Sequence, residues 1–429
     1  MKKKPIILAM SFLGLLAVSC SREYFPAHDD GPAPTTPYRY GIRSAGEAVS
    51  IAQESLDRFY PGTKSEKGKE VSCIIPYVSA STKGTASDTL FYIVNFGENE
   101  GFALINTDPA VAPLLVITEE GHYEGRETEN TGFNLYMDNL VTQLSSRFSG
   151  GPILPPIDYN YLDTLRYTDT QKTPLLQSAW GQNGPFAELT PNHYPAGCTP
   201  IAIGQIMAYY QHPDTVQLKY PGASPSYITP AWANMAAHNS HDTEQCSICL
   251  MNARFIREVG RRLQTLYGTQ SGTTMDGVDQ GLPALGYTHS AASSYSPQNV
   301  LAAVDLNRPV LAFASFQGSN GGHTWVIDGY QFQDRSIDYY RFVSFNLDGS
   351  LNLVYGGHDE ETCYYFHFNL GQGGEYNGYY ISYHYVNQTG IIFPTPRPDT
   401  VLIDAFAEDL QSGIPNHNRL MIYDMLPNN

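Results

Sequence analysis

The feature that most constrains the fold is a predicted helix that starts at a cysteine. Gly197-Cys198-Thr199-Pro200 opens the apolar run IAIGQIMAYY. Proline suits the first turn of a helix, so this pattern predicts a helix whose N-terminus presents Cys198. The positive end of the helix dipole lowers the pKa of a thiol there and favours the thiolate. The alternative is that Cys198 is a small buried hydrophobic residue, as most cysteines outside disulfides are.

Two other segments carry groups that could act with a thiolate. Gln182 lies upstream of Cys198, and His323 lies far downstream in the segment GGHTW. A histidine completes a thiolate–imidazolium pair, and a glutamine amide contributes to an oxyanion hole. The two glycines before His323 remove side chains where substrate would lie, although His323 alternatively caps a strand or a turn. If the fold brings the three segments together, they form a cysteine hydrolase.

Composition excludes several other classes of protein. The 429 residues suffice for two domains, and 31 Tyr, 38 Gly and 29 Pro favour strands and turns over a helical bundle. A formal net charge of −17 without a basic stripe argues against nucleic acid as a partner, because phosphate would be repelled. The aspartates lack calcium-loop spacing and there is no phosphate-binding glycine loop. We therefore expect no metal or organic cofactor.

The first twenty residues have the pattern of an export signal. Lys2 to Lys4 are basic, Ile6 to Val18 are apolar, and Ser19 precedes Cys20. Ala-Val-Ser-Cys resembles a bacterial lipoprotein cleavage box, which predicts lipidation of Cys20 and a location in the cell envelope. The alternative is an ordinary secretory signal that happens to contain a cysteine. Without Cys20 an odd number of cysteines remains, so at least one thiol cannot pair within the monomer: Cys73, Cys198, Cys246, Cys249 and Cys363.

The chain after the signal divides into a short tether and a first domain. Residues 21–40 are polar and rich in proline, and we expect a tether. Residues 41–150 predict a small α+β domain. Ser44 and Glu47 form a capping box before a helix, four strand-like runs follow, and a second helix closes the unit. The predicted runs lie at 71–78, 90–97, 101–108 and 112–120, and the second helix at 132–148.

A second domain is predicted over residues 173–395. Residues 151–172 have weak periodicity and read as an exposed linker where proteases cut. A helix over 248–266 has one apolar face that includes Phe255, Leu263 and Leu266. Tyrosine-rich strands follow over 309–393, and helices before antiparallel strands indicate an α+β fold in two layers. Residues 396–429 have no motif that we can interpret and form an extension of unknown role.

Three segments together resemble the streptopain-like cysteine peptidases, a branch of the papain-like clan. They are WGQNGPF at 180–186, GCTPIAIGQIMAYYQHP at 197–213 and GGHTWVIDGY at 321–330, and the similarity covers most of residues 174–392. Residues 101–123 resemble the inhibitory propeptide of that family. The resemblance implies a papain-like peptidase domain, made as a zymogen and acting on polypeptides. It also implies that Cys198 is the nucleophile, that His323 is the general base and acid, and that Gln182 binds the oxyanion.

The resemblance further implies roles for three residues, and it has one departure. Thr273 and Gly322 would contact substrate, and Asn369 would orient the imidazole. The family pattern Asn-Trp-Gly-Trp-Gly-Gly is replaced here by NLGQGG at 369–374. Because Leu370 and Gln372 replace the two tryptophans, we expect a wetter and weaker Asn369 contact and reduced or narrowed activity. Residues 334–363 read as an extra hairpin, which we expect to rim the active site.

Some alternatives stay open at this point. His238-x2-His241-x4-Cys246-x2-Cys249 has the residue types of a zinc site, but it lacks paired CxxC knuckles and export favours oxidation. A polar loop with a local disulfide, or two unrelated thiols, fits the same run. For the whole chain, the main alternative is a surface lipoprotein that uses a papain-like fold as a binding module with weak or no catalysis. A third possibility is amide transfer to an amine acceptor.

Overall fold

The computed structural model describes thirteen stretches of the chain, and the predicted signal, tether and lipidation site at Cys20 lie outside them. The described residues are 43–61, 69–78, 89–108, 111–149, 161–220, 222, 224–239, 246–290, 293–315, 321–345, 351–389, 400–404 and 421–428. Among these residues, no helix has the length and apolarity needed to cross a bilayer.

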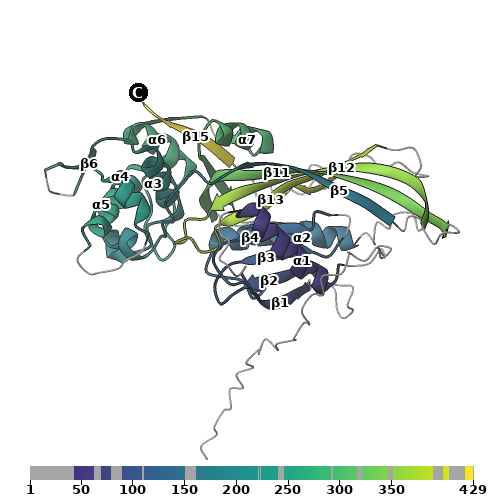
Figure 1. Cartoon of the computed structure of the whole chain (residues 1–429). Helices are drawn as coiled ribbons and strands as arrows, with labels where there is room; N and C mark the ends of the chain where they lie inside the picture. Colours follow the sequence, from purple (N-terminus) through teal and green to yellow (C-terminus); the bar gives the residue numbers. More distant parts are fainter. Residues whose placement is uncertain are drawn as a thin grey trace, which may run out of the picture. The chain divides into compact units, whose positions relative to one another are not determined.

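The N-terminal region has the order of elements that its sequence predicts (Figure 1). Helix α1, Ala45–Phe59, begins with the predicted capping box: the Ser44 hydroxyl accepts from the Glu47 N–H, and the Glu47 carboxylate accepts from the Ser44 N–H. The four strands pair in sequence as an antiparallel meander. Their bounds, with those of helix α2, are β1 Val71–Val78, β2 Thr89–Phe96, β3 Phe102–Asn106, β4 Leu114–Thr118 and α2 Thr131–Ser149.

Most helices of the second region pack around a separate apolar core, whereas Val300 and Val304 of the helix that begins at Pro297 belong to the core that the N-terminal region shares with the large sheet. Helix α3, Cys198–Tyr210, lies against α5, Ser247–Arg262, because Gly204 has no side chain: a Cβ there would lie 2.5 Å from Ile256 Cδ1. The buried indole of Trp180 fills the space beside this contact. The other helices and the short strands between them are α4 Trp232–Ala237, α6 Met275–Leu285, α7 Pro297–Asp305, β6 Val216–Leu218 and β7 Ser226–Ile228.

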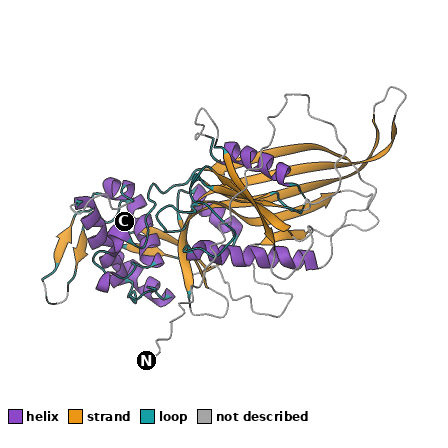
Figure 2. Ribbon diagram, turned by 90° about the horizontal axis from the view of Figure 1, so that it is seen from below, coloured by secondary structure: helices purple, strands orange, loops and turns teal. Residues whose placement is uncertain are grey.

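The remaining strands join β1–β4 in one antiparallel sheet, which Figure 2 shows beside the helices. Its main path runs β1-β2-β3-β4-β13-β12-β11-β10-β15-β8, and β5, β9 and β14 pair beside it. The bounds are β5 Tyr161–Lys172, β8 Tyr287–His289, β9 Ser293–Ser294, β10 Val310–Ser315, β11 Gly322–Phe345, β12 Leu351–Asn369, β13 Gly378–Thr389, β14 Thr400–Asp404 and β15 Met421–Pro427. The predicted α+β class is confirmed.

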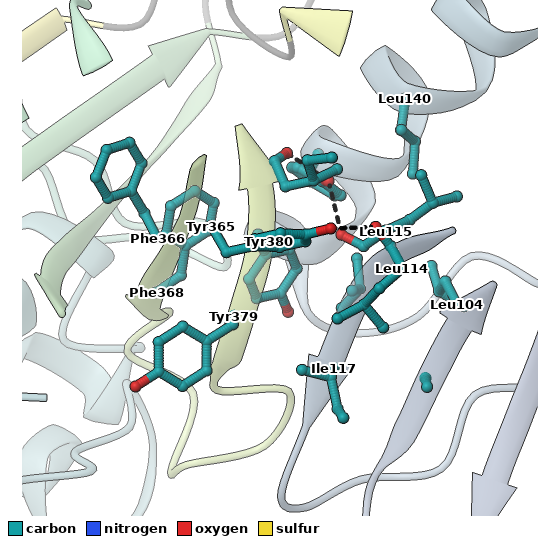
Figure 3. Packing of buried hydrophobic residues seen from close by; sticks show 14 of the residues in the cluster. Leu104, Leu114, Leu115, Ile117, Leu140, Tyr365, Phe366, Phe368, Tyr379 and Tyr380 are labelled. Atoms are coloured by element: carbon teal, nitrogen blue, oxygen red, sulfur yellow. Dashed lines mark hydrogen bonds between the residues drawn. The ribbon is translucent and has the colours of Figure 1, made fainter. Parts of the chain in front are cut away.

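Strands β4 and β13 join the N-terminal meander to the strands of the second region. Their pairing places Thr118 opposite Gly378 and Val116 opposite Tyr380. Figure 3 shows the apolar packing along this seam, where Leu114, Leu115 and Ile117 lie near Tyr365, Tyr379 and Tyr380. The Tyr365 hydroxyl also donates to the Leu114 carbonyl at 2.9 Å. Removing the N-terminal region would therefore break a strand pair and expose buried aromatic rings.

The predicted linker over 151–172 is wrong for its second half. Residues 161–172 form β5, which pairs with β11 from Lys172 opposite Tyr330 to Tyr161 opposite Tyr340. Strand β10 covers the same edge of β11 only as far as Ile327, so a long row of backbone groups would otherwise lack partners. Pairing with the open edge of β11 thus makes residues 161–172 a strand although their local sequence pattern is weak. Residues 150–160 lie outside the described residues.

Two other expectations also need correction. Leu266 is 74% exposed, because α5 stops near Leu263 and Gln264 takes a positive φ of 56°. Residues 396–429 are more than an uninterpreted extension: β14 pairs with β13, and β15 pairs with β10 and β8.

The predicted extra hairpin exists, but the far end of its described strands, at Phe345 and Leu351, does not rim the site. Strands β11 and β12 pair from Val326 opposite Asn369 to Phe345 opposite Leu351. At about 3.3 Å per residue, Phe345 lies roughly 70 Å along the strand from His323. The base of this hairpin carries the candidate site residues, and strands β11 and β12 run from there away from helices α3 to α6 (Figure 1).

Candidate active site

Helix α3 begins at Cys198, as the sequence predicts. Its N-cap is Gly197 with φ 91°, a conformation that a residue with a side chain rarely adopts. A Cβ on Gly197 would lie 3.5 Å from Ser271, so the glycine-rich loop before α6 passes directly beside the helix start. Cys198 as a whole residue is half-buried there.

The fold brings His323 of β11 into hydrogen-bond contact with Cys198 of α3. His323 lies at the start of β11, opposite Ala314 of β10, and is only 1% exposed. The hydroxyl groups of Thr199 and Thr324 are 2.8 Å apart. This bond joins the residue after the cysteine to the residue after the histidine, and so fixes the two elements relative to each other.

The electrostatics favour an ion pair between the two side chains. Burial by itself would raise the pKa of the Cys198 thiol, but the charge of His323 and hydrogen bonds from His323 and Thr324 lower it to about 7. Burial would likewise lower the pKa of His323, but the Cys198 thiolate and the Leu370 carbonyl raise it above its usual value. Each group thus stabilises the charged form of the other.

The imidazole of His323 is held by two oxygen atoms. Its Nε2 lies 2.8 Å from the Leu370 carbonyl oxygen, and its Nδ1 lies 3.0 Å from Thr131 Oγ1. A carbonyl oxygen can only accept, so Nε2 carries a proton. In the neutral imidazole Nδ1 is then the basic atom, and the Thr131 hydroxyl lies against it.

Asn369 is buried near His323 but bonds elsewhere. Its Oδ1 accepts from Gln205 Nε2 at 3.1 Å and from the Gly371 N–H, and its Nδ2 donates to the Ser178 carbonyl at 2.7 Å. Among the described residues no hydrogen bond joins Asn369 to His323, because the Leu370 carbonyl takes the position at Nε2.

The expectation of a wetter Asn369 is wrong. Asn369 is 3% exposed and Leu370 is 1% exposed. Leucine therefore keeps water away from this amide even though both family tryptophans are replaced, and the replacement gives no solvent-based reason for reduced activity.

The other predicted residues also lie around the start of α3. The Gln182 carbonyl accepts from the Ala196 N–H at 2.8 Å, two residues before Cys198. Gly322 has no room for a side chain, since a Cβ would lie 2.4 Å from the Ala314 carbonyl oxygen. The Thr273 hydroxyl bonds that of Thr265 at 2.8 Å, in the loop that passes Gly197.

Sequence reasoning missed Gln205 as a support for this site. Fully buried in α3, it accepts from the Trp180 N–H at 3.0 Å and donates to Asn369. It thereby connects the segment of Gln182 to that of Asn369. The available signal was a single amide side chain within an otherwise apolar helix, because a buried amide needs hydrogen-bond partners.

The start of α2 also contributes to the site, and nothing in the sequence indicated it. Asn130 caps α2 by accepting from the Phe133 N–H, and its Nδ2 donates to the Glu375 carbonyl at 3.1 Å. Gly132 lies so close to His323 that a Cβ there would be 2.5 Å from Cδ2 of the ring. The N-terminal region is thus fitted directly over the predicted general base.

Comparison with known proteins agrees with this geometry. Residues 180–380 match the model of the Peptidase C10 family, and the matched segment contains Gln182, Cys198, His323 and Asn369. This confirms the resemblance to cysteine peptidases, and it supports a cysteine peptidase as the class of activity.

Two individual relatives extend the comparison beyond the C10 segment. The thiol protease/hemagglutinin PrtT of Porphyromonas gingivalis is 23% identical over 326 residues, which are 68% of this chain and 33% of that protein. The chain thus spans about a third of the length of that curated relative. A solved fragment of Prevotella intermedia prointerpain A aligns with a TM-score of 0.48 and 17% identity, over 82% of this chain and 98% of that one.

Proposed function

We propose that this protein is an exported cysteine endopeptidase made as a zymogen. The observation that carries the proposal is the pairing of Cys198 with His323 at the start of α3, with the pKa of the thiol lowered to about 7. An ordinary buried cysteine has a raised pKa and is inert, so a lowered value beside a histidine supports a nucleophile.

In the proposed reaction the Cys198 thiolate attacks the scissile carbonyl carbon. The charged oxygen of the tetrahedral intermediate is stabilised by the Gln182 amide and the N–H groups at the start of α3. The C–N bond breaks as His323 gives its proton to the departing amine, which leaves a thioester on Cys198. His323 then takes a proton from water, the hydroxide attacks the thioester, and the carboxylic acid product leaves as the thiol is restored.

Inhibition in this proposal comes from the start of α2. When His323 is neutral, the Thr131 hydroxyl donates to Nδ1 and so occupies the lone pair that would accept a proton. Gly132 packs on the same ring and on Leu370. Withdrawal of α2 would free the His323 imidazole from Thr131. Asn369, which directly precedes Leu370, could then orient the ring in place of the Leu370 carbonyl.

Activation then requires a cut that spares strand β5. A protease binds an extended segment whose backbone is unpaired, whereas β5 is paired with β11 along its length. Gln171 of β5 also donates to the Phe59 carbonyl at the end of α1. We therefore place the cut before Tyr161 and keep β5 with the mature enzyme. The cut would separate the peptidase from the proposed lipid anchor at Cys20 unless the β4–β13 pair held the pieces together.

A binding module without catalysis is the second candidate, and one observation favours it. The amide of Asn369 is fully engaged with Ser178, Gln205 and Gly371 and does not touch the imidazole. Labelling of Cys198 by an active-site-directed epoxide separates the two candidates, because a binding module has no need of an activated thiol.

The proposal is tested by following intact mass during incubation under reducing conditions. The chain without residues 1–20 is compared with its Cys198→Ala variant, and Cys73→Ser serves as the matched cysteine control. We expect wild type and Cys73→Ser to cut themselves before Tyr161 while Cys198→Ala persists. The proposal fails if Cys198→Ala is cut at the same rate as wild type. It also fails if neither protein is cut and wild type that an added protease has cut before Tyr161 does not react with the epoxide.

A further inference from the structure

A second cluster of thiols and imidazole lies between helices α4 and α5 and does not include Cys198. His238 ends α4, Cys246 is the N-cap of α5, and Cys249 lies in the first turn of α5. His238 Nε2 is 3.1 Å from Cys249 Sγ and 3.2 Å from Cys246 Sγ. All three potential ligand atoms lie within 4.8 Å of one another.

These spacings are close to those of a tetrahedral metal centre. With Zn–S of about 2.3 Å and Zn–N of about 2.0 Å, a tetrahedral ion holds its nitrogen and sulfur ligands about 3.5 Å apart. The two N···S distances need to open by only a few tenths of an ångström to admit the ion. Soft thiolates with one imidazole are a ligand set that zinc prefers.

The surroundings favour a thiolate at Cys246 and require a cation beside a thiolate at Cys249. The Cys249 N–H donates to Cys246 Sγ at 3.1 Å, and Cys246 caps a sixteen-residue helix whose dipole favours negative charge. Cys249 is 3% exposed, so its thiolate would need a cation beside it. The Asn252 amide, fully buried, donates to the His238 carbonyl at 3.4 Å and holds the backbone that carries the imidazole.

We propose that His238, Cys246 and Cys249 bind one Zn²⁺ ion. Two thiols lose their protons to solvent on binding, so Zn²⁺, two thiolates and a neutral imidazole leave the site without net charge. Three protein ligands leave one tetrahedral position for a further donor. His241, which completes the pattern in the sequence, lies outside the described residues. This inference does not depend on the proposed peptidase activity.

The proposed zinc site would stabilise the loop that supports the segment leading to Gln182. Asn239 follows His238 directly, and its Oδ1 accepts from the Ala179 N–H at 2.9 Å. Ala179 precedes Trp180 and Gly181, the segment that leads to Gln182. A metal that joins the end of α4 to the start of α5 would therefore fix the loop on which this segment rests.

The test measures zinc in the chain without residues 1–20, in a Cys198→Ala background that removes the reactive thiol of the other site. The protein is purified under reducing conditions, incubated with zinc chloride and dialysed before elemental analysis. X-ray absorption at the zinc edge counts the sulfur ligands in unsubstituted sites. His238→Ala, Cys246→Ser and Cys249→Ser are compared with Cys73→Ser, and circular dichroism checks that each variant folds.

We expect about one zinc per chain with two sulfur ligands, and the same for Cys73→Ser. Each substitution in the site should weaken zinc binding by at least about tenfold and lower the Tm of the zinc-loaded protein by roughly 5 °C. The proposal is overturned if the zinc has no sulfur ligand, if the three variants bind zinc as wild type does, or if the reduced protein binds no zinc. Because the absorption measurement uses unsubstituted sites, a variant that fails to fold does not remove the test.

Discussion

Helices α3 and α5 each present a cysteine at their N-terminus, and each cysteine has a histidine beside it. At α3 a single sulfur faces one imidazole, and the ring is further held by oxygens of Leu370 and Thr131. At α5 two sulfurs share one imidazole, and the ring nitrogen lies almost equally far from both. This difference in the number of sulfur atoms around the ring underlies the two proposals, a nucleophile with its base at α3 and a set of metal ligands at α5.

The two sites also differ in the part of the chain that packs against them. The α3 site lies where the N-terminal region packs on the peptidase, so it is covered by a segment that could withdraw. The α5 site lies within the helical half and braces the chain through Asn239. One arrangement suits regulated chemistry and the other suits stability.

The largest difference should come from removing each histidine in turn. After the N-terminal region is removed, His323→Ala should lower kcat/KM on peptide substrates by at least about a thousandfold, because the general base and the stabilised thiolate are both lost. His238→Ala should cost less than about tenfold, through the position of the Ala179 segment. If the two variants lost kcat/KM equally, the two sites would not differ in their part in catalysis.

The next effect concerns Gly132, which lies on the His323 ring. Gly132→Ala places a methyl group 2.5 Å from Cδ2, so α2 must shift at a cost of about 1–3 kcal/mol. Self-cleavage of the zymogen, followed by intact mass, should accelerate by roughly tenfold or more. Gly46→Ala is the matched control, because Gly46 is likewise the second residue of its helix and a Cβ there would meet nothing closer than 4.0 Å. Unchanged cleavage in Gly132→Ala would count against contact inhibition.

A smaller effect is expected in the pH dependence of Cys198. The thiolate forms as pH rises through the pKa, so alkylation by iodoacetamide should speed up with pH and level off above about 7. Thr324→Val removes a hydroxyl that lowers this pKa, so the midpoint should move upward by up to about one pH unit. Thr324→Ser retains the hydroxyl and should keep the wild-type midpoint. A midpoint that is the same in all three proteins would exclude this role for Thr324.

The smallest effect is expected at Asn239, which connects the two sites. Asn239→Ala removes the bond to the Ala179 N–H and should lower the free energy of unfolding by about 1 kcal/mol, measured by denaturant titration. We expect kcat/KM to fall by only about two- to fivefold and zinc binding to persist. A loss as large as that of His323→Ala would mean that the two sites are not separable.

Local patterns predicted most of the elements, and long-range pairing explains the failures. The capping box at Ser44 and the helix start at Cys198 depend on neighbouring residues, and both are confirmed. Strand β5 was missed because its partner β11 lies some 160 residues later, and the open edge of that strand is invisible in the local sequence. The same holds for β15, which completes the sheet from the far end of the chain.

The candidate site shows the same division. Motifs identified Cys198, His323, Gln182 and Asn369, and the fold places all of them near the start of α3. No motif indicated Thr131, because its part in the site depends on how α2 packs against the sheet. The bonding of Asn369 to Gln205 was equally out of reach, since it depends on the rotation of one buried amide.

The most direct test of the account is the rate at which iodoacetamide alkylates Cys198 at pH 7, mapped by peptide mass spectrometry. The rate is measured in the intact chain without residues 1–20 and again after the N-terminal region has been cut off and removed. If the start of α2 holds His323 and keeps it from activating the thiol, alkylation should be at least about tenfold faster after removal, with Cys73→Ser behaving as wild type. Equal rates before and after removal would contradict the account.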